Sequence, residues 1–153
     1  TRAMKLKALG KDVVVLCDSD KDDKLVPSKQ DLRDKQIKVF DWESNNSIEQ
    51  QVFNDLPWEA VIELLQYIEK EFPETNIENS VKSKHGNHLP DNWRDVDAAQ
   101  TRLAVGEAAR SGEWFKRTYR GEFLGFVIFK YFQKIMNKKT KEQLNALIDW
   151  VDA

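Results

Sequence analysis

The sequence has 153 residues, of which 41% are hydrophobic and 33% charged, and its net charge is −2. These values predict one ordinary soluble domain, and no apolar run approaches the length needed to span a membrane. The nearly balanced charge argues against a generally basic coat, so any contact with nucleic acid would depend on local patches. The single cysteine, Cys17, gives no disulfide framework, and we expect it to be buried because it lies in an apolar run. No secretory leader precedes that run, so we expect a cytoplasmic protein.

The first 72 residues alternate between the patterns of helices and strands. Apolar residues at helical spacing and a capping pair at Ser47 and Gln50 mark helices, while short apolar runs mark strands. The predicted order is a helix at 3–9, a strand at 12–17, a helix at 27–35, a strand at 38–42 and helices at 48–54 and 57–72. Such alternation implies right-handed crossovers, so we predict the α/β class, with a mainly parallel sheet flanked by helices. We expect the first strand to be buried on both faces.

The remainder of the chain is predicted to be a polar loop followed by a helical part, 91–153. The stretch 73–90 is polar and contains several asparagines, which predicts a long mobile loop or insertion. Helices are predicted at about 91–111, 120–137 and 141–152. Thr140 and Gln143 form a capping-box pattern for the last of them. The stretch 123–135 is apolar on nearly all sides, so it should be buried or should cover a missing partner domain.

Two carboxylates directly follow the first apolar run. Asp18, Ser19 and Asp20 come after the run that begins at Val13 and ends at Cys17. Ligands of open α/β sheets bind beyond the carboxyl ends of the strands, and residues at i and i+2 point the same way. Both carboxylates could therefore face one cation, and carboxylate oxygens are ligands that Mg²⁺ and Mn²⁺ prefer. Asp18 and Asp20 are thus the candidate metal ligands.

Three other interpretations apply to this acidic motif. The motif does not fit an EF-hand calcium loop, because such a loop needs glycine at the position of Asp23 and glutamate at the position of Lys29. A phosphatase of the haloacid-dehalogenase type also carries two aspartates after an apolar strand, the first of them being the nucleophile. There glycine and then threonine or valine normally follow, whereas Lys21 and Asp22 follow here. In the third interpretation the strand simply ends in a solvated acidic turn.

Several segments resemble the Toprim nuclease half of the overcoming-lysogenisation-defect (OLD) family, in which an ABC-type ATPase is coupled to a Toprim nuclease. They are Val14–Asp20, Val39–Trp42, Asn46–Gln50 and Gly112–Arg117 with Gly121–Glu122. The resemblance implies a Toprim-like fold in which Asp18, Asp20 and Glu49 are metal ligands. The last segment resembles the C-terminal segment of the family, which supplies a catalytic lysine. Lys116 is the best match for that lysine, and Lys130 is a distant second.

The resemblance also implies a function and a missing part. The function is Mg²⁺- or Mn²⁺-dependent cleavage of DNA by an ATP-linked endonuclease, in bacterial defence against phage. Clustered carboxylates would hold the metal, and the lysine would stabilise charge that develops on the phosphate. Toprim domains have an earlier strand that ends in glutamate. We expect that strand, and the ATPase that binds ATP, upstream of Thr1, so the chain would be a partial Toprim domain that is inactive in isolation and belongs to a homo-oligomer.

Plainer interpretations stand beside these roles. Glu49 could be a first-turn glutamate that the helix dipole favours, and Lys116 could be an ordinary surface lysine. Arg117 and Arg120, with neighbouring lysines of the helical part, could follow a DNA backbone or could form a solvated helix face.

Two rival functions belong to other classes. The main rival is a non-catalytic domain that serves as an oligomerisation or regulatory module, and a phosphohydrolase of the dehalogenase type comes next. His85 and His88 lie in the polar loop without nearby cysteines, so they give only a weak signal for zinc.

Overall fold

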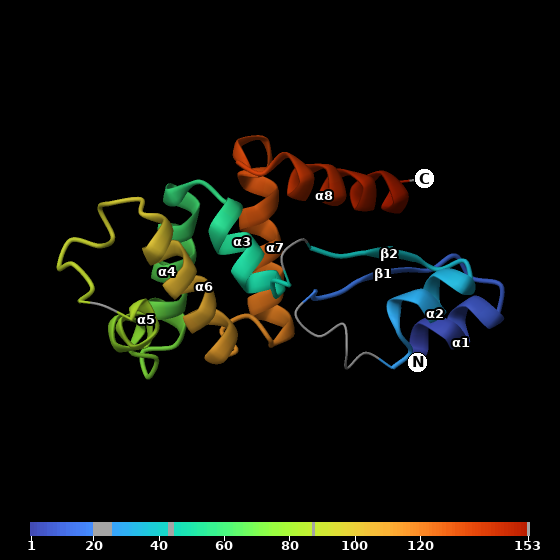
Figure 1. Cartoon of the computed structure of the whole chain (residues 1–153), viewed down its shortest axis with the longest axis horizontal. Coiled ribbons are helices and arrows are strands. Elements are labelled where there is room, and N and C mark those ends of the chain that lie inside the picture. The colour runs from blue at the N-terminus through green and yellow to red at the C-terminus, as the bar shows by residue number, and fades with distance from the viewer. Residues whose placement is uncertain (20–25, 43–44, 87, 153) are drawn as a thin grey trace. The chain divides into compact units, whose positions relative to one another are not determined.

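A computed structural model describes residues 1–19, 26–42, 45–86 and 88–152. The chain divides into two compact units, one made of residues 1–48 and 142–153 and the other of residues 49–141. Figure 1 labels the elements along the chain. The first unit carries both strands, and the second carries most of the helices.

The first unit is built around a parallel pair of strands. Its elements are α1 (Arg2–Ala8), β1 (Val14–Leu16), α2 (Lys29–Asp34), β2 (Lys38–Phe40) and the greater part of α8 (Lys138–Val151). Leu16 of β1 lies beside Phe40 of β2, and the Cys17 N–H donates to the Phe40 carbonyl oxygen at 3.0 Å. The buried side chains of Leu32, Ile37, Phe40 and Trp42 supply the core of this unit. The predicted parallel pairing of these two segments is therefore confirmed.

Local contacts hold α2, which lies between β1 and β2 along the chain. Ser28 and Asp31 form a capping box, in which the Ser28 hydroxyl accepts from the Asp31 N–H at 3.1 Å and the Asp31 carboxylate accepts from the Ser28 N–H at 2.9 Å. At the same helix start the buried Lys29 ammonium lies 2.9 Å from the Asp41 carboxylate. Because Asp41 directly follows β2, this ion pair ties α2 to the end of that strand.

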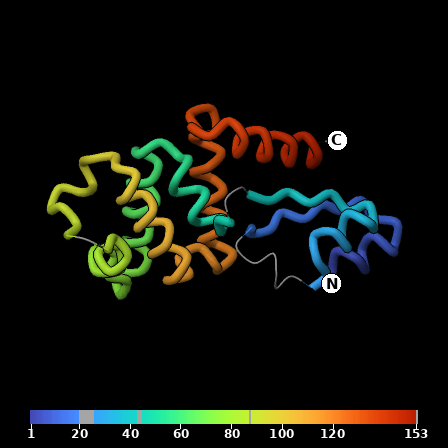
Figure 2. The backbone as a smooth tube through the Cα atoms, viewed as in Figure 1, coloured from blue at the N-terminus to red at the C-terminus, as the bar shows by residue number. Residues whose placement is uncertain are grey.

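The second unit is helical. Its elements are α3 (Ile48–Asp55), which starts at the unit boundary, α4 (Trp58–Glu71), α5 (Ile77–His85), α6 (Ala99–Ser111), α7 (Thr118–Lys130), the 3-10 helix η2 (Phe132–Lys134) and the start of α8. Helix α5 packs against α6, and α4 packs against α7 (Figure 2). The predicted apolar face of α4 is confirmed, because Val61, Leu64, Leu65, Ile68 and the following Phe72 are all buried.

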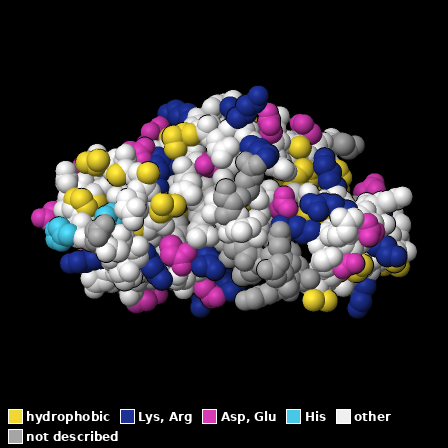
Figure 3. Space-filling model, viewed as in Figure 1, with side chains coloured by type: hydrophobic (Ala, Val, Ile, Leu, Met, Phe, Trp, Pro, Cys, Tyr) yellow, Lys and Arg dark blue, Asp and Glu magenta, His cyan; other side chains and the backbone are white. Residues whose placement is uncertain are grey.

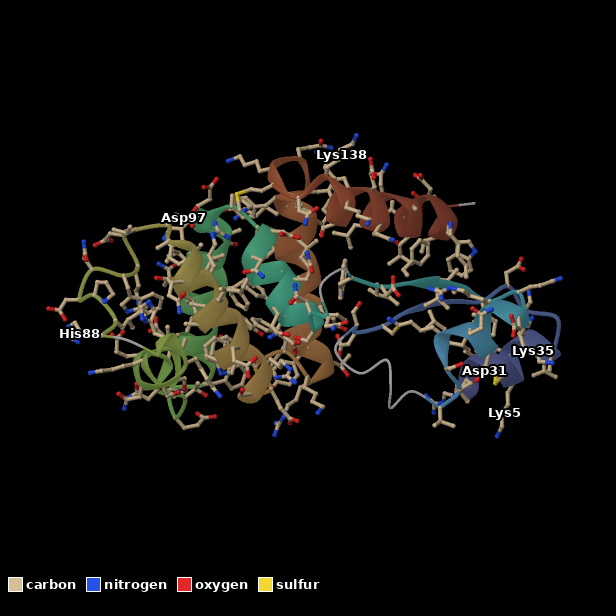
Figure 4. All side chains as sticks on the ribbon, in the orientation of Figure 1. Lys5, Asp31, Lys35, His88, Asp97 and Lys138 are labelled. Carbon is tan, nitrogen blue, oxygen red and sulfur yellow. The ribbon has the colours of Figure 1, made fainter. Side chains whose placement is uncertain are left out.

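A buried arginine closes the end of α3. The Arg102 guanidinium donates to the carbonyl oxygens of Phe53 at 2.9 Å and Leu56 at 2.7 Å, and to the Asp97 carboxylate at 2.8 Å. Figure 4 shows Asp97 just before α6. These carbonyls belong to the last turn of α3 and the residue after it, where helical partners are missing. Arg102 therefore links α6 to the end of α3.

A second buried polar cluster joins α3 to the start of α8. The Asp55 carboxylate accepts from the Thr140 hydroxyl at 2.6 Å and from the Gln51 side-chain amide at 2.5 Å. The cap of α8 is Asn137, whose side chain accepts from the Lys139 N–H at 2.9 Å. The predicted capping role of Thr140 is thus wrong, because its hydroxyl serves the buried carboxylate.

The predicted fold class is wrong. Over the described residues the protein has eight α-helices and only one pair of strands, each three residues long, and not a mainly parallel Toprim-like sheet. The order of the first six elements matches the prediction, but later apolar residues recur at helical spacing and add no strand. The first strand is also not buried on both faces. Leu16 is 37% exposed, and Cys17, expected to be buried, is only half-buried.

Other boundaries differ for local reasons. The expected loop at 73–90 contains α5, because Ile77 and Val81 bury one face and the Asn76 side chain accepts from the Asn79 N–H at 2.8 Å. The expected helix at 91–111 begins only at Ala99. The expected helix at 120–137 ends at Lys130 and is followed by η2.

Candidate functional site

Asp18 links the end of β1 to the start of α3. One residue separates it from the last residue of the strand, and its side chain is half-buried. Its carboxylate Oδ1 accepts from the backbone N–H of Ile48 at 2.8 Å. A carboxylate at a helix N-terminus satisfies an amide that has no helical partner and is favoured by the helix dipole. The strand end predicted to carry a metal ligand therefore also carries a long-range helix cap.

The backbone on both sides of Asp18 is held in place. The Cys17 N–H donates to the Phe40 carbonyl oxygen, and the Ser19 N–H donates to the carbonyl oxygen of Asn46 at 3.0 Å. The Ser19 hydroxyl accepts from the Trp42 N–H at 2.8 Å and donates to the Trp42 carbonyl oxygen. The strand end is consequently tied both to the continuation of β2 and to the segment that enters α3.

Glu49 lies in the first turn of α3 and directly follows Ile48. The prediction that Glu49 opens a helix is confirmed. The preceding residue, Ile48, is the one whose backbone N–H donates to the Asp18 carboxylate. Both of its predicted roles, metal ligand and dipole partner, remain compatible with this position.

Lys116 lies between α6 and α7, with a side chain that is 68% exposed. Its ammonium pairs with the Glu113 carboxylate at 2.5 Å. That hydrogen bond raises the pKa of Lys116, and the charge of Glu49 contributes to the shift in the same direction. Lys116 thus stays cationic through neutral pH and lies within electrostatic reach of Glu49, a residue of the same unit.

Lys130, the second candidate for the catalytic lysine, has a structural contact. Its ammonium lies 2.8 Å from the Glu63 carboxylate, so it ties α7 to α4. The Glu63 hydrogen bond also raises the pKa of Lys130. Lys130 is therefore a useful comparison for Lys116, because both are exposed cations in ion pairs.

The two predicted DNA-binding arginines lie at the start of α7. Arg117 is the exposed residue before the helix, and the Arg120 guanidinium stacks on Phe72, 3.2 Å from the ring centroid. Hydrogen bonds from Arg120 and Arg117 lower the pKa of the Tyr119 hydroxyl. Acidic and basic side chains are interspersed on the face drawn in Figure 3, as the balanced composition leads one to expect.

The proposed ligand set is not brought together as a whole. Asp20 lies outside the described residues, Asp18 belongs to the first unit, and Glu49 and Lys116 belong to the second. Within the described ranges, no three His, Cys, Asp or Glu side chains form a group that could hold a metal ion. This includes His85, buried at the end of α5, and the exposed His88 (Figure 4).

Sequence reasoning missed the residues that support Asp18. Ser19 stands between two aspartates in the sequence, and a small hydroxyl residue at a strand end can bond to neighbouring backbone groups. Asp41 was also missed, and the signal for it was available, because it is an acidic residue directly after the second apolar run. Its observed partner is Lys29.

No protein-family model, curated protein or solved structure matches this chain. None of the described helices has both the length and the apolar composition needed to cross a membrane.

Proposed function

We propose that this chain contributes acidic ligands and a lysine to a metal-dependent DNA endonuclease of the ATP-linked OLD type. The supporting observation is the hydrogen bond between the Asp18 carboxylate and the first amide of α3, whose next residue is Glu49. This contact orients a carboxylate at a strand end by a hydrogen bond to the first residue of α3.

The donor chemistry fits Mg²⁺ or Mn²⁺, which take oxygen ligands. Asp18, Asp20 and Glu49 would hold the ion, and the bound ion would activate water and polarise the scissile phosphate. The contact with Ile48 uses Oδ1 of Asp18, which limits the directions in which its other oxygen can point. Lys116 supplies an ammonium for the charge that develops on the phosphate, and Arg117 and Arg120 neutralise flanking phosphates.

The remaining parts of the proposal concern the whole protein. In a protein of this type, ATP binding belongs to the coupled ATPase. The protein is cytoplasmic, forms homo-oligomers and defends bacteria against phage. These points derive from the resemblance of the sequence segments to the OLD family.

An exposed aromatic surface favours the second candidate, a non-catalytic interaction module. Phe126 and Phe129 of α7 are 57% and 73% exposed, although Leu124 and Val127 of the same helix are buried. Large exposed apolar side chains that lie close together are typical of protein interaction surfaces. The sequence predicts that this stretch is either buried or covers a partner domain, and the exposure of Phe126 and Phe129 does not agree with full burial.

Three assays on the natural full-length protein separate these functions. The nuclease nicks supercoiled plasmid with Mg²⁺ or Mn²⁺ and stops in EDTA. A dehalogenase-type phosphohydrolase releases phosphate from small esters instead. A module does neither, and its self-association weakens when Phe129 is replaced by Glu. Plasmid left intact with both metals and ATP would contradict the proposed nuclease.

A further inference from the structure

One face of α7 is exposed along most of the helix and is apolar at its centre. The exposed residues Glu122, Gly125, Phe126 and Phe129 follow the i, i+3, i+4, i+7 spacing of a single helix face. Phe126 and Phe129 are 57% and 73% exposed. We call these four residues, together with the exposed Lys130, the α7 face.

The aromatic part of the α7 face is held in position from within the second unit. The Phe126 ring contacts the Phe123 ring with 6.2 Å between centroids, and Phe123 stacks on Tyr67 of α4 with 3.8 Å between centroids. A side chain whose conformation is set before binding loses little entropy when a partner arrives. Phe126 is therefore a pre-organised aromatic anchor of the kind that dominates protein interfaces.

Gly125 leaves bare backbone at the centre of the α7 face. A Cβ at this position would meet no atom within 4 Å, so alanine would fit in the single chain. Glycine is less favourable than alanine inside a helix. The single chain thus gives no reason for glycine here, whereas the absence of a side chain allows another backbone to approach closely.

The charges at the two ends of the α7 face are complementary to each other. Glu122 lies four residues before Phe126, and Lys130 lies four residues after it. If two copies of α7 pack antiparallel with Phe126 at the two-fold axis, Glu122 of each copy lies opposite Lys130 of the other. A parallel packing would instead place like charges together. The Lys130 ammonium has three donors and gives two at most to Glu63, so one remains for a second carboxylate.

We propose that the α7 face binds the α7 face of a second copy of this chain in an antiparallel, two-fold symmetric contact. Phe126 and Phe129 form its apolar centre, and two pairs of Glu122 with Lys130 flank that centre. The contact supplies a surface and a register for the homo-oligomer, and it rests on that part of the proposed function. It needs neither metal nor DNA.

Sedimentation equilibrium of the 153-residue chain in EDTA measures the dissociation constant of the dimer. Phe129→Glu should raise this constant by at least about tenfold, because each dimer contains the substitution twice. Leu103→Glu is the matched control and should leave it unchanged, since Leu103 is a 55% exposed apolar residue on α6 of the same unit.

Gly125→Ala separates close packing of two helices from the stability of one chain. The added methyl group should raise the dissociation constant of the dimer by about tenfold, because the two backbones can no longer approach as closely. The same change should raise the urea midpoint of the dilute, monomeric chain, since alanine favours the helix. Self-association and stability should therefore move in opposite directions.

Two charge reversals test the antiparallel register. Glu122→Lys and Lys130→Glu should each raise the dissociation constant by about fivefold, because each places like charges opposite one another. An equimolar mixture of the two variants should return to within about threefold of wild type, since both pairs in the mixed dimer then join opposite charges. If repulsion from Glu63 unfolds Lys130→Glu, Lys130→Gln takes its place, and a partial recovery is expected in the mixture.

The outcomes separate this contact from the proposed nuclease. A wild-type chain that stays monomeric at about 1 mM would overturn the contact. Equal weakening by Leu103→Glu and Phe129→Glu, or no recovery in the mixture, would also overturn it. Plasmid nicking by a monomeric full-length protein would overturn the contact and leave the nuclease standing. A dimer with the expected properties in a full-length protein that leaves plasmid intact would support the contact and contradict the nuclease.

Discussion

The carboxylate of Asp18 accepts a hydrogen bond of 2.8 Å from the backbone amide of Ile48, thirty residues later in the chain. This contact alone would make Asp18 a helix cap. The proposed function also requires the negative charge of Asp18. A helix cap needs only a hydrogen-bond acceptor, whereas a metal ligand needs the charge as well.

Two substitutions of Asp18 separate the cap from the metal ligand. Asp18→Asn keeps an acceptor for the Ile48 amide, so the free energy of unfolding should change little, while Mn²⁺ binding should be lost. Asp18→Ala removes the acceptor too and should cost about 1 kcal/mol of stability. Urea unfolding and Mn²⁺ titration of both variants check this. Equal metal binding by wild type and Asp18→Asn would leave the cap as the whole role of the residue.

Arg102 should be one of the most sensitive positions in the second unit. Arg102→Met retains much of the apolar stem but leaves the carbonyl oxygens of Phe53 and Leu56 without their donor, and Asp97 without its partner. We expect a loss of about 3 kcal/mol in the free energy of unfolding. Asp97→Asn should cost less than about 1 kcal/mol, because that side chain is 45% exposed. Denaturant titration measures both, and equal losses would contradict the central place given to the guanidinium.

The ion pair of Arg102 and Asp97 gives a pH dependence of defined sign. The guanidinium holds the pKa of the Asp97 carboxyl below its ordinary value. A carboxyl with a lowered pKa in the folded state contributes stability above its unfolded pKa, about 3.9. That contribution is lost as the pH falls through the folded value. The stability difference between wild type and Asp97→Asn should therefore persist at pH 7 and shrink below about pH 4. A difference that grows on acidification would refute the assignment.

The parts of this structure that could be predicted from the sequence are those that depend on residues close together in the chain. The order of elements from α1 to α4 follows from the spacing of apolar residues and from two short apolar runs, which are short-range signals. The extent of the sheet could not be predicted, because two short apolar runs do not reveal how many partners they pair with. The exposed Phe126 shows the same limit, since apolar character alone does not say what covers a side chain.

The candidate site shows the same division between local and long-range signals. The position of Asp18 at a strand end was predictable, and so was Glu49 in the first turn of a helix. The contact of Asp18 with Ile48, the bonds from Ser19 to Trp42 and the ion pair of Lys29 with Asp41 join residues distant in sequence. Spacing cannot predict such contacts, because they depend on how the elements pack.

Lys116 should act on the transition state and not on DNA binding. Lys116→Ala should lower the single-turnover cleavage rate by about 10²- to 10³-fold while DNA affinity stays nearly constant. Lys130→Ala is the comparison, since it removes an ion pair with Glu63 and should leave the chemical step unchanged. Single-turnover cleavage and DNA affinity of the full-length protein measure both effects. A normal rate for Lys116→Ala would return that residue to the role of an ordinary surface cation.

The most direct test of the central claim is plasmid nicking in Mn²⁺ by the full-length protein and two isosteric variants. Asp34 provides the control, because it is an exposed aspartate of the same unit that ends α2 and does not follow a strand. Wild type and Asp34→Asn should nick at similar rates, and Asp18→Asn should be slower by at least about 100-fold, since the ion loses a charged ligand. Nicking by Asp18→Asn at the wild-type rate would contradict the account.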